Sequence, residues 1–504
     1  MRKRHLMMAA AVLTAMALSG CGGGSSSGNS GGSGTEAGAN GGAQAGDNGS
    51  GAGAEDGAGA ENGNGAGDNA GAENGAGDSA GAGSSAAGAA YGSTYDVAAA
   101  GDVVLDVMIT SLGDSDGGPY LRGVMEDYMA LYPNVTLNPV ECSMNDLYTT
   151  LITQATAGTL PDIFTMSEAY SANCLEMGMA VDNLPELLGQ EYMDSLMPAA
   201  VENATIGDTL VYMPWQNNIT AMVYRKDLFE EKGIEVPTTW DEFLEAAKAL
   251  TEDLDGDGKI DQYGCVFAGQ RNDSAESRFQ TFALTWGCDF VTDNGDGTYT
   301  SGFGTEEFKN AMESFINLAV NEGVAPAGFV ETGYSEAYTM IASGQACMFF
   351  SPSNVLGGIY NANPDMRGKM GSFPMPTAEG VDPVTSFSSV GMTISNTCEN
   401  PEVAADFLKY MTSVETSVAW NEATCRLPVV EEALNAICEK DPAYSGFAEA
   451  SDSAVIYPAF AGLAELRDAS AECWQSVVSE GVSLDEAVER AAQKAEEAAA
   501  AYSS

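Results

Sequence analysis

The sequence is poor in basic residues. Among its 504 residues there are 72 acidic side chains and only 20 lysines and arginines, so the formal net charge is −52. Nucleic acids and anionic lipid surfaces are bound through basic patches, and this charge balance therefore opposes both as partners. The excess of acid favours a soluble protein whose ligand is neutral or cationic.

Histidine is almost absent. The only one, His5, lies in an N-terminal segment that we expect to be removed. Without histidine, the mature protein cannot form a Ser-His-Asp or Cys-His catalytic group or a histidine-based zinc or iron site. Carboxylate chemistry, such as that of glycosidases, is still open because acidic side chains are abundant. We expect no cofactor.

Cysteine motifs are missing as well. Nine cysteines follow Cys21, and none of them forms a Cys-x-x-Cys pair, so the spacing of a zinc site is absent. Export would permit disulfides, but an odd and scattered set argues against a disulfide framework. We therefore expect mostly reduced cysteines, with Cys347 as a buried thiol inside an apolar run.

Long hydrophobic runs are absent after the N-terminus. Residues 6–18 form an apolar run of 13 residues, too short for a mature transmembrane helix, and follow the basic residues Arg2, Lys3 and Arg4. The phrase Leu-Ser-Gly-Cys at 18–21 resembles the lipobox of bacterial lipoproteins. It implies cleavage before Cys21 and a diacylglyceryl group on its sulfur, which would hold the protein stably on a membrane. The alternative is an ordinary cleaved signal.

Large apolar residues are absent from residues 22–90. Residues 22–95 carry 8 acidic and no basic side chains and are otherwise mostly glycine, alanine, serine and asparagine. Such a segment cannot bury enough surface to offset the entropy of ordering it, so we predict disorder. As a flexible coil it would span roughly 45–50 Å, a tether above a membrane.

Strand and helix patterns alternate beyond the tether. Residues 103–110, 134–140 and 161–166 are strand-like, and residues 120–132 and 145–157 have helical spacing. This alternation predicts a parallel sheet, in which ligands bind beyond the carboxyl ends of the strands. The polar residues at those ends are the first candidates for a binding site: Ser111, Asp114, Ser167, Glu168 and Tyr170.

Three phrases resemble extracellular solute-binding proteins of ABC importers, family 1, the sugar-binding, maltose-binding-protein-like group. They are Ala-Gly-Thr-Leu-Pro-Asp-Ile-Phe at 157–164, the segment Tyr-Met-Pro to Tyr-Arg-Lys-Asp-Leu-Phe at 212–229, and Pro-Thr-Thr-Trp-Asp-Glu-Phe at 237–243. The resemblance covers roughly residues 101–500. It implies a two-lobed α/β fold of the type II periplasmic-binding-protein kind, in which each lobe is a mainly parallel sheet flanked by helices and crossing segments join the lobes.

The resemblance also predicts the division of the chain. We expect a signal peptide at residues 1–20 and a lipidated cysteine with its linker at 21–95. The first lobe would comprise residues 96–216 and 373–425, and the second lobe residues 217–372 and 426–504. Residues 210–229 are the stretch where the family's chain crosses between lobes, along the floor of the ligand cleft.

Aromatic and amide side chains at this crossing suit a sugar. Aromatic rings stack on the apolar face of a pyranose, and amides, hydroxyls and carboxylates bond to its hydroxyl groups. The resemblance places further candidates on both lobes, although each taken alone is as well explained by packing. Besides the strand-end residues, the set comprises Trp215, Gln216, Asn217, Asn218, Trp286, Ser351, Ser353, Asn354, Ser388 and Trp420.

A calcium-type loop follows the last of the three phrases, at residues 237–243. Asp253, Asp255, Asp257 and Asp261 fit positions 1, 3, 5 and 9 of an EF-hand loop, and Lys259 occupies position 7, which offers a backbone carbonyl. The twelfth position, usually glutamate, is Gly264, so one ligand is missing. The alternative is an aspartate-rich turn without metal.

The sequence thus predicts a lipid-anchored receptor on the extracellular face of a bacterial membrane. It would capture a sugar or oligosaccharide by closing two lobes, as a monomer, and deliver it to ABC permease subunits; it would be no enzyme and would touch the membrane only through its lipid. Two alternatives stay open: a cell-surface glycosidase that uses carboxylates, and the same fold binding a polyamine or a peptide.

Overall fold

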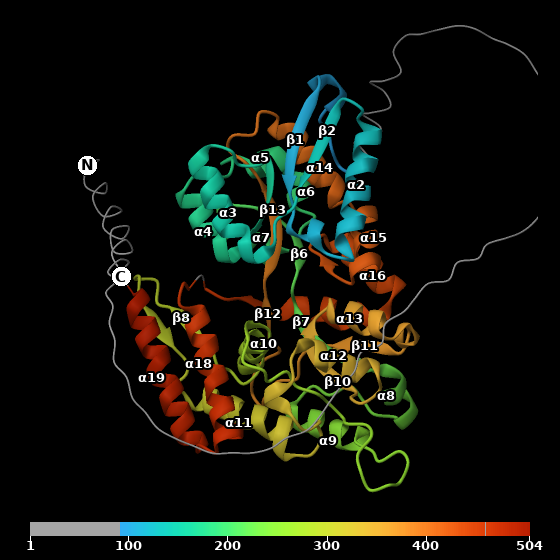
Figure 1. The fold of residues 1–504 in the computed structure, drawn as a ribbon, viewed down its shortest axis with the longest axis vertical. Helices are drawn as coiled ribbons and strands as arrows, with labels where there is room; N and C mark the ends of the chain where they lie inside the picture. Colours follow the sequence, from blue (N-terminus) through green and yellow to red (C-terminus); the bar gives the residue numbers. More distant parts are fainter. Residues whose placement is uncertain (1–90, 459, 504) are drawn as a thin grey trace, which may run out of the picture. The chain divides into compact units, whose positions relative to one another are not determined.

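A computed structural model describes residues 91–458 and 460–503 (Figure 1). These residues form two main sheets, each flanked by helices, which agrees with the expected two-lobed α/β class. We call residues 91–217 and 389–430 the first lobe, and residues 220–373 and 441–503 the second lobe. The signal peptide, Cys21 and most of the predicted linker lie outside the described residues.

The first-lobe sheet has six strands in the order β14-β6-β13-β3-β1-β2. Their bounds are β1 (Val103–Met108), β2 (Val135–Val140), β3 (Ile163–Ser167), β6 (Met213–Asn217), β13 (Ser389–Ile394) and β14 (Leu427–Pro428). β1 pairs in parallel with β2 and β3, which confirms the predicted parallel core. β13 is antiparallel to both β3 and β6 because it enters this sheet from the second lobe, at the edge where β3 and β6 end.

Helices cover the first-lobe sheet and connect its strands. They are α2 (Gly117–Leu131), α3 (Met144–Ala157), α4 (Glu168–Glu176), α5 (Leu184–Leu188), α6 (Gln190–Met193), α7 (Pro198–Asn203), α14 (Pro401–Met411) and α15 (Val414–Thr424), with a hairpin of β4 (Thr205–Ile206) and β5 (Thr209–Leu210). The Ser143 side chain caps α3, and left-handed Gly158 ends it. The Asn400 side chain makes no cap bond to α14; Pro401 begins the helix, where its missing N–H costs nothing.

The second-lobe sheet is antiparallel, which corrects the expectation of a mainly parallel sheet in each lobe. β7 (Thr220–Arg225) lies between β10 (Met348–Pro352) and β11 (Met370–Phe373) and pairs antiparallel with both. The connection from β7 to β10 contains several helices and can return to either end of the sheet. Strand and helix order alone therefore does not determine the direction of β10.

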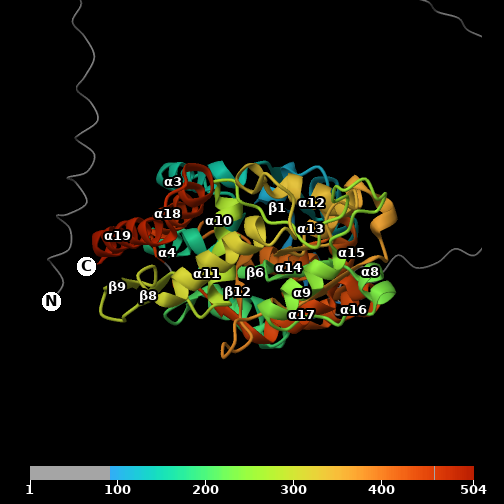
Figure 2. The same ribbon diagram turned by 90° about the horizontal axis from the view of Figure 1, so that it is seen from below.

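Most helices of the second lobe follow β7. They are α8 (Lys226–Lys232), α9 (Trp240–Leu250), α10 (Asp273–Leu284), α11 (Glu306–Ile316), α12 (Tyr334–Ala342), α13 (Val355–Ala362), α17 (Ser445–Ala450), α18 (Leu463–Gln475) and α19 (Leu484–Tyr502), with a hairpin of β8 (Val291–Asp293) and β9 (Tyr299–Ser301). Both views place α18 and α19 side by side (Figures 1 and 2). α16 (Glu431–Lys440) packs on α15 of the first lobe and on α17 of the second.

Two crossings between the lobes lie side by side. Only Asn218 and Ile219 separate β6 from β7, and only Ser388 separates β12 (Thr385–Phe387) from β13. The Asn218 N–H donates to the Ser388 carbonyl at 2.9 Å, and the Thr385 hydroxyl donates to the Thr220 carbonyl at 2.7 Å. β12 also pairs in parallel with β15 (Ala454–Ile456), so three chain segments meet where the two sheets adjoin.

The folded body begins before residue 96, which corrects the predicted end of the linker. Tyr91 and Ser93 both donate hydroxyl hydrogen bonds to Asp406, which is almost fully buried in α14. The sequence could not show this because the acceptor lies more than 300 residues further along the chain. Among the described residues, no helix has the length and apolar character needed to cross a membrane.

All nine cysteines of the described part are free thiols. Cys347 is buried in the run that precedes β10, where burial raises the pKa of its thiol to about 12. A thiol with such a pKa is almost entirely protonated at neutral pH and is a poor nucleophile.

Candidate functional site

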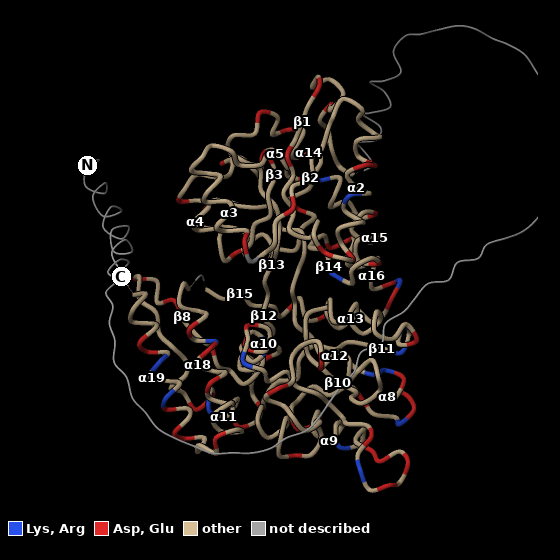
Figure 3. Tube along the Cα trace, viewed as in Figure 1, with Lys and Arg blue, Asp and Glu red and all other residues tan. Residues whose placement is uncertain are grey.

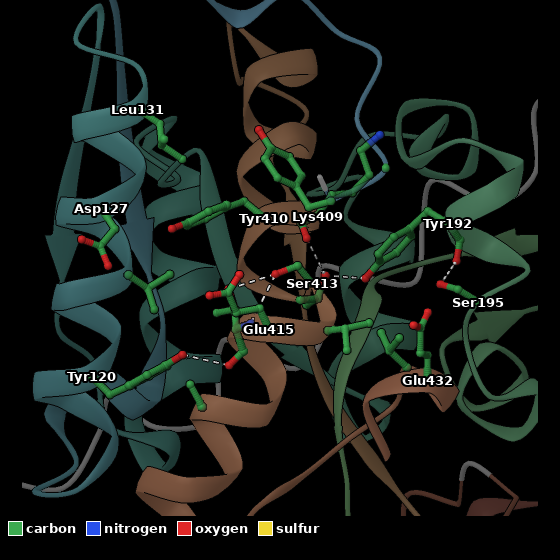
Figure 4. Close-up of a pocket in the computed structure, with 18 of the residues that line it drawn as sticks. Tyr120, Asp127, Leu131, Tyr192, Ser195, Lys409, Tyr410, Ser413, Glu415 and Glu432 are labelled. Atoms are coloured by element: carbon green, nitrogen blue, oxygen red, sulfur yellow. Dashed lines mark hydrogen bonds between the residues drawn. The ribbon is translucent and has the colours of Figure 1, made fainter. Parts of the chain in front are cut away.

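A cavity of about 1030 Å³ lies on the first lobe, between α2, α6, α14 and α15 (Figure 4). Its lining includes four tyrosines and four acidic residues, and its one lysine, Lys409, donates to the Leu188 carbonyl at 3.1 Å. None of the binding residues predicted from the sequence lines it. The predicted binding residues lie instead mainly at the strand ends and the crossings.

The carboxyl end of β3 presents three of the predicted residues. Ser167 is buried, and the ring of Tyr170 stacks on that of Tyr148 with centroids 4.9 Å apart and planes 7° apart. Glu168 begins α4, and its loss of contact with water raises the pKa of its carboxyl group, an effect that Arg467 of the second lobe opposes. The charge of a second-lobe arginine therefore acts on Glu168.

The crossing residues Trp215, Gln216 and Asn217 are all buried in β6. The Asn217 amide nitrogen donates to the Pro428 carbonyl at 2.8 Å, while its amide oxygen is buried with no hydrogen-bond partner. The Asn218 amide donates to the Ser388 hydroxyl at 3.4 Å. The structure therefore brings five of the predicted residues together along the two adjacent crossings.

Two of the predicted tryptophans pack on each other. The ring centroids of Trp215 and Trp420 are 4.8 Å apart, and Tyr120 extends the cluster at 5.7 Å from Trp420. Both tryptophans are almost fully buried, yet the indole N–H of Trp420 has no acceptor. Their rings hold the first lobe together beneath the crossing, and the free indole N–H is the polar group they can offer.

Asp114 forms an ion pair rather than standing free. Its carboxylate accepts from Nη2 of Arg426 at 2.9 Å, and Asp116 lies 3.9 Å from Nη1 of the same guanidinium. Nη1 is buried and has no hydrogen-bond partner of its own. Arg426 precedes β14, so it stands at the crossing together with the two tryptophans.

The second lobe contributes Ser351 at the end of β10. Its fully buried hydroxyl accepts from Nη2 of Arg278, on α10, at 2.9 Å. Ser353 is also buried, whereas Asn354 precedes α13 and is exposed. Trp286, after the end of α10, has a buried indole N–H without an acceptor. Among the described residues, Asn354 and Trp286 share no hydrogen bond or ring contact with another candidate, so they stand apart from the crossing.

Unpaired polar atoms gather where the two sheets adjoin. Native proteins leave few buried polar atoms without a partner, and each such atom calls for an explanation such as an absent ligand or water. Five of the eight buried unpaired side-chain atoms found here belong to the crossings, their tryptophan cluster and the neighbouring helix α10. They are Asn217 Oδ1, Arg278 Nε, Gln280 Nε2, Trp420 Nε1 and Arg426 Nη1.

The family model of bacterial extracellular solute-binding proteins matches residues 113–417. The chain belongs to this family. It is therefore a solute-binding protein, not the glycosidase that abundant carboxylates left open, and it acts outside the cell. The match spans both crossings and includes every predicted binding residue except Ser111 and Trp420.

Individual relatives of this solute-binding protein are distant in sequence. A protein of Deinococcus radiodurans named as an ABC transporter-binding protein is 24% identical over 246 residues, which are 46% of this chain and 56% of that protein. A Brucella abortus protein named as a binding protein is 25% identical over 407 residues, which are 79% of this chain and 93% of that protein.

A solved structure shares the fold of the solute-binding protein. The cyclic alpha-maltosyl-1,6-maltose binding protein of Arthrobacter globiformis superposes with a TM-score of 0.64 at 23% identity. The alignment covers 79% of this chain and 99% of that one. At this identity the likeness shows that both chains fold alike.

Three polar residues of the solute-binding protein's site were missed from the sequence. Arg467 donates to the Gln280 side-chain oxygen at 2.9 Å, and the Gln280 amide nitrogen is left without an acceptor. Arg278 lies two residues before Gln280 on α10, between serine and phenylalanine. An arginine followed directly by phenylalanine, in a chain with few basic residues, is the signal that could have found it.

Proposed function

We propose that this protein captures a sugar or oligosaccharide between its two lobes and delivers it to an ABC permease. The observation that carries the proposal is the group of buried, unpaired amide, indole and guanidinium atoms beside the crossings of a solute-binding protein. These groups bond to hydroxyl and ring oxygens, and hydroxyl-rich ligands satisfy several such groups at once. The aromatic rings nearby supply apolar contact.

The relatives support a carbohydrate as the ligand. The Arthrobacter globiformis protein is named for the cyclic maltosyl-maltose that it binds. Similar curated proteins are named as a multiple sugar-binding protein and as a mannitol-binding protein. Polyhydroxylated ligands are common to these names, whereas a polyamine is absent from them.

Closure about the crossings is the proposed mechanism. Short segments join the lobes at residues 218–219 and at Ser388. Such segments act as hinges when a ligand binds to both lobes. A ligand that contacts Glu168 or Asn217 on one side and Gln280 on the other would stabilise the closed arrangement relative to the open one. The permease would then recognise the closed form.

A thermal-shift screen tests the proposed ligand class. The chain from residue 22 onward is heated with mono- and oligosaccharides, and with polyamines and peptides alongside. A ligand at 100 times its Kd adds about 2.7 kcal/mol to the free energy of unfolding, which amounts to several degrees of melting temperature. Shifts confined to carbohydrates support the proposal, and shifts confined to polyamines or peptides contradict it.

We also propose that Cys21 carries the lipid that holds the receptor at the membrane. The Leu-Ser-Gly-Cys sequence at 18–21 follows a charged and apolar leader, and two acyl chains suffice for stable anchoring. The protein expressed in a lipoprotein-processing bacterium should partition into detergent, and a Cys21→Ala variant should remain in the aqueous phase. Equal partitioning of the two would contradict lipidation.

A weak calcium site is proposed in the loop after α9. Carboxylate oxygens of Asp253, Asp255 and Asp261 lie within 4.8 Å of one another. Asp253 also accepts from the N–H groups of Gly256 and Gly258, which folds the loop around its carboxylate. The donors suit a hard cation, although Asp257 is paired with Lys259 at 2.9 Å and the twelfth position lacks a carboxylate.

Calorimetry tests the metal independently of the sugar. Calcium titrated into chelator-treated protein should release or absorb heat with a dissociation constant near the millimolar range typical of weak extracellular sites. The signal should vanish in an Asp253→Asn, Asp261→Asn variant. Absence of heat at millimolar calcium in the unmodified protein would remove the metal from the account.

A further inference from the structure

Arg278 is a buried cation that forms no ion pair among the described residues. Its side chain is 8% exposed. Nη1 donates to the carbonyl and hydroxyl oxygens of Ser274, both at 2.6 Å, and Nη2 donates to the Ser351 hydroxyl at 2.9 Å. All these acceptors are neutral, and the remaining donor, Nε, has no acceptor.

No acidic side chain compensates this charge closely. The carboxylate that acts on Arg278 most clearly is Asp273, which is exposed and bonded at 2.9 Å to Arg467 instead. The faces of Tyr334 and Phe349 lie 4.6 and 5.5 Å from the guanidinium carbon and supply only cation–π contact. Burial lowers the pKa of Arg278 to about 10, so the side chain stays charged at neutral pH.

A second guanidinium approaches from the first lobe. The guanidinium carbon of Arg278 lies 4.6 Å from the centre of the Tyr334 ring; burial raises the pKa of the Tyr334 hydroxyl group, and both Arg278 and Arg426 act to lower it. Arg426 has two aspartates beside it, but its Nη1 is buried and makes no hydrogen bond. Each lobe therefore offers one unused guanidinium N–H near Tyr334.

We propose that the ligand is an acidic sugar, whose carboxylate is bound by Arg278 with Arg426 nearby. This inference rests on the proposed function and names the class of sugar. Nε and Nη2 of an arginine share one edge, which fits a carboxylate with two parallel hydrogen bonds, and Nη2 uses only one of its two hydrogens on Ser351. The proposal requires that the opening of the two lobes expose Nε to the ligand.

The unpaired charge explains why the chain places an arginine here at all. A buried cation without a counter-ion is unfavourable in the unliganded protein, and an anionic group supplied by the ligand removes that penalty. A neutral sugar would leave the charge uncompensated. A polyamine would bring further positive charge to two guanidinium groups. The acidic composition of the whole chain therefore does not predict the charge of the ligand at this site.

Binding of matched acidic and neutral sugars tests the inference. Oligogalacturonates and glucuronate-containing oligosaccharides are titrated by calorimetry beside their methyl esters, which keep the shape and remove the charge. We expect the acid to bind at least about tenfold more tightly than its ester, as for one charge-assisted hydrogen bond. A neutral oligosaccharide and a sugar phosphate complete the set.

Variants assign the preference to the residue. In Arg278→Gln the ratio of the affinities for the acid and its ester should fall below about threefold, while the affinity for the ester stays unchanged. In the control Arg122→Gln, which alters an exposed ion pair with Glu141, the ratio should be unchanged. The unliganded Arg278→Gln protein should melt no more than about 3 °C below the unmodified one, because an uncompensated buried charge is lost.

Each other outcome is decisive. Tight binding of neutral sugars with equal affinity for acid and ester would overturn the acidic-sugar inference and leave the sugar receptor intact. A preference for the sugar phosphate over both uronates would overturn the carboxylate assignment. A large fall in melting temperature in Arg278→Gln, with all sugars weakened equally, would assign the arginine a structural role. Binding of no carbohydrate at all would instead contradict the proposed function.

Discussion

Glu168 and Asp406 are first-lobe carboxylates that differ in burial and in hydrogen bonding. Asp406 is buried and accepts from the hydroxyl groups of Tyr91, Tyr128 and Ser93. Glu168 has no such set of donors, and burial raises the pKa of its carboxyl group. The Asp406 carboxylate therefore stabilises the fold, whereas Glu168 is available to a partner from outside the chain.

Replacing Glu168 should stabilise the unliganded protein at neutral pH. A carboxyl group whose folded-state pKa is raised contributes stability below the ordinary value of 4.5 and loses it as the pH rises through the folded-state pKa. Glu168→Gln should thus raise the midpoint of urea unfolding at pH 7 and leave it unchanged near pH 4. Glu176→Gln, an exposed site at the end of the same helix, is the control. A lower midpoint at pH 7 would show that the charged form is stabilised in the fold.

Removing the Asp406 carboxylate should have the opposite effect. Asp406→Ala leaves three hydroxyl groups without their acceptor, and each buried unsatisfied group costs about 1–3 kcal/mol. We expect the free energy of unfolding, measured with urea, to fall by about 3 kcal/mol or more, and proteolysis near Tyr91 to accelerate. Asp127→Ala, at an exposed position of α2, should change little. A loss below 1 kcal/mol would disprove this anchoring role.

Residue types at strand ends were predictable, whereas their partners were not. Glu168 and Ser351 were candidates because strand ends and family phrases place them there. Arg278 was missed because its importance depends on the absence of a carboxylate partner. Its partner Ser351 lies more than 70 residues further along the chain, and no local pattern shows that this partner is a neutral hydroxyl group. Asp114 was predicted as a free acceptor, and its pairing with Arg426, more than 300 residues away, was likewise invisible.

Helix α9 shows how local sequence determines an element. The Thr239 hydroxyl accepts from the Glu242 N–H, and the Glu242 carboxylate accepts from the Thr239 N–H. Both hydrogen bonds of a capping box are therefore present. This arrangement satisfies two backbone donors that the first turn leaves free. Trp240 and Phe243 then pack into the core of the second lobe.

Loss of this cap should cost a measurable part of the stability. Thr239→Ala removes the hydroxyl acceptor, and such caps contribute about 1 kcal/mol. We expect the free energy of unfolding to decrease by this amount with unchanged affinity for the ligand, because α9 carries none of the candidate binding residues. Thr239→Ser, which keeps the hydroxyl, should behave like the unmodified protein. Equal losses in both variants would indicate that the methyl group matters instead.

Element positions followed from sequence more faithfully than strand directions did. The helix at Met144–Ala157 begins and ends near its expected bounds because its serine cap and terminal glycine are local signals. The direction of β10 depends on where a connection of more than 100 residues returns to the sheet, which is set by packing on β7. The second sheet was therefore predicted as parallel and is antiparallel.

At the scale of the whole molecule, charge and site are separate features. Acidic residues occur throughout both lobes and basic ones are few (Figure 3). Net charge governs solubility and long-range attraction, but a ligand is recognised by the groups it touches. The expectation of a neutral or cationic ligand came from composition alone, which could not show that Arg278 is buried without an ion-pair partner among the described residues.

Reversible sugar binding between the two lobes is the central property that we propose for this protein. Calorimetric titration of the chain from residue 22 onward with carbohydrates selected by the thermal screen, followed by mass analysis of the recovered sugar, tests this claim. The account predicts one bound sugar per chain with a Kd of about micromolar or tighter, and a sugar recovered unchanged. Absence of binding by every carbohydrate class, or recovery of a cleaved sugar, would contradict it.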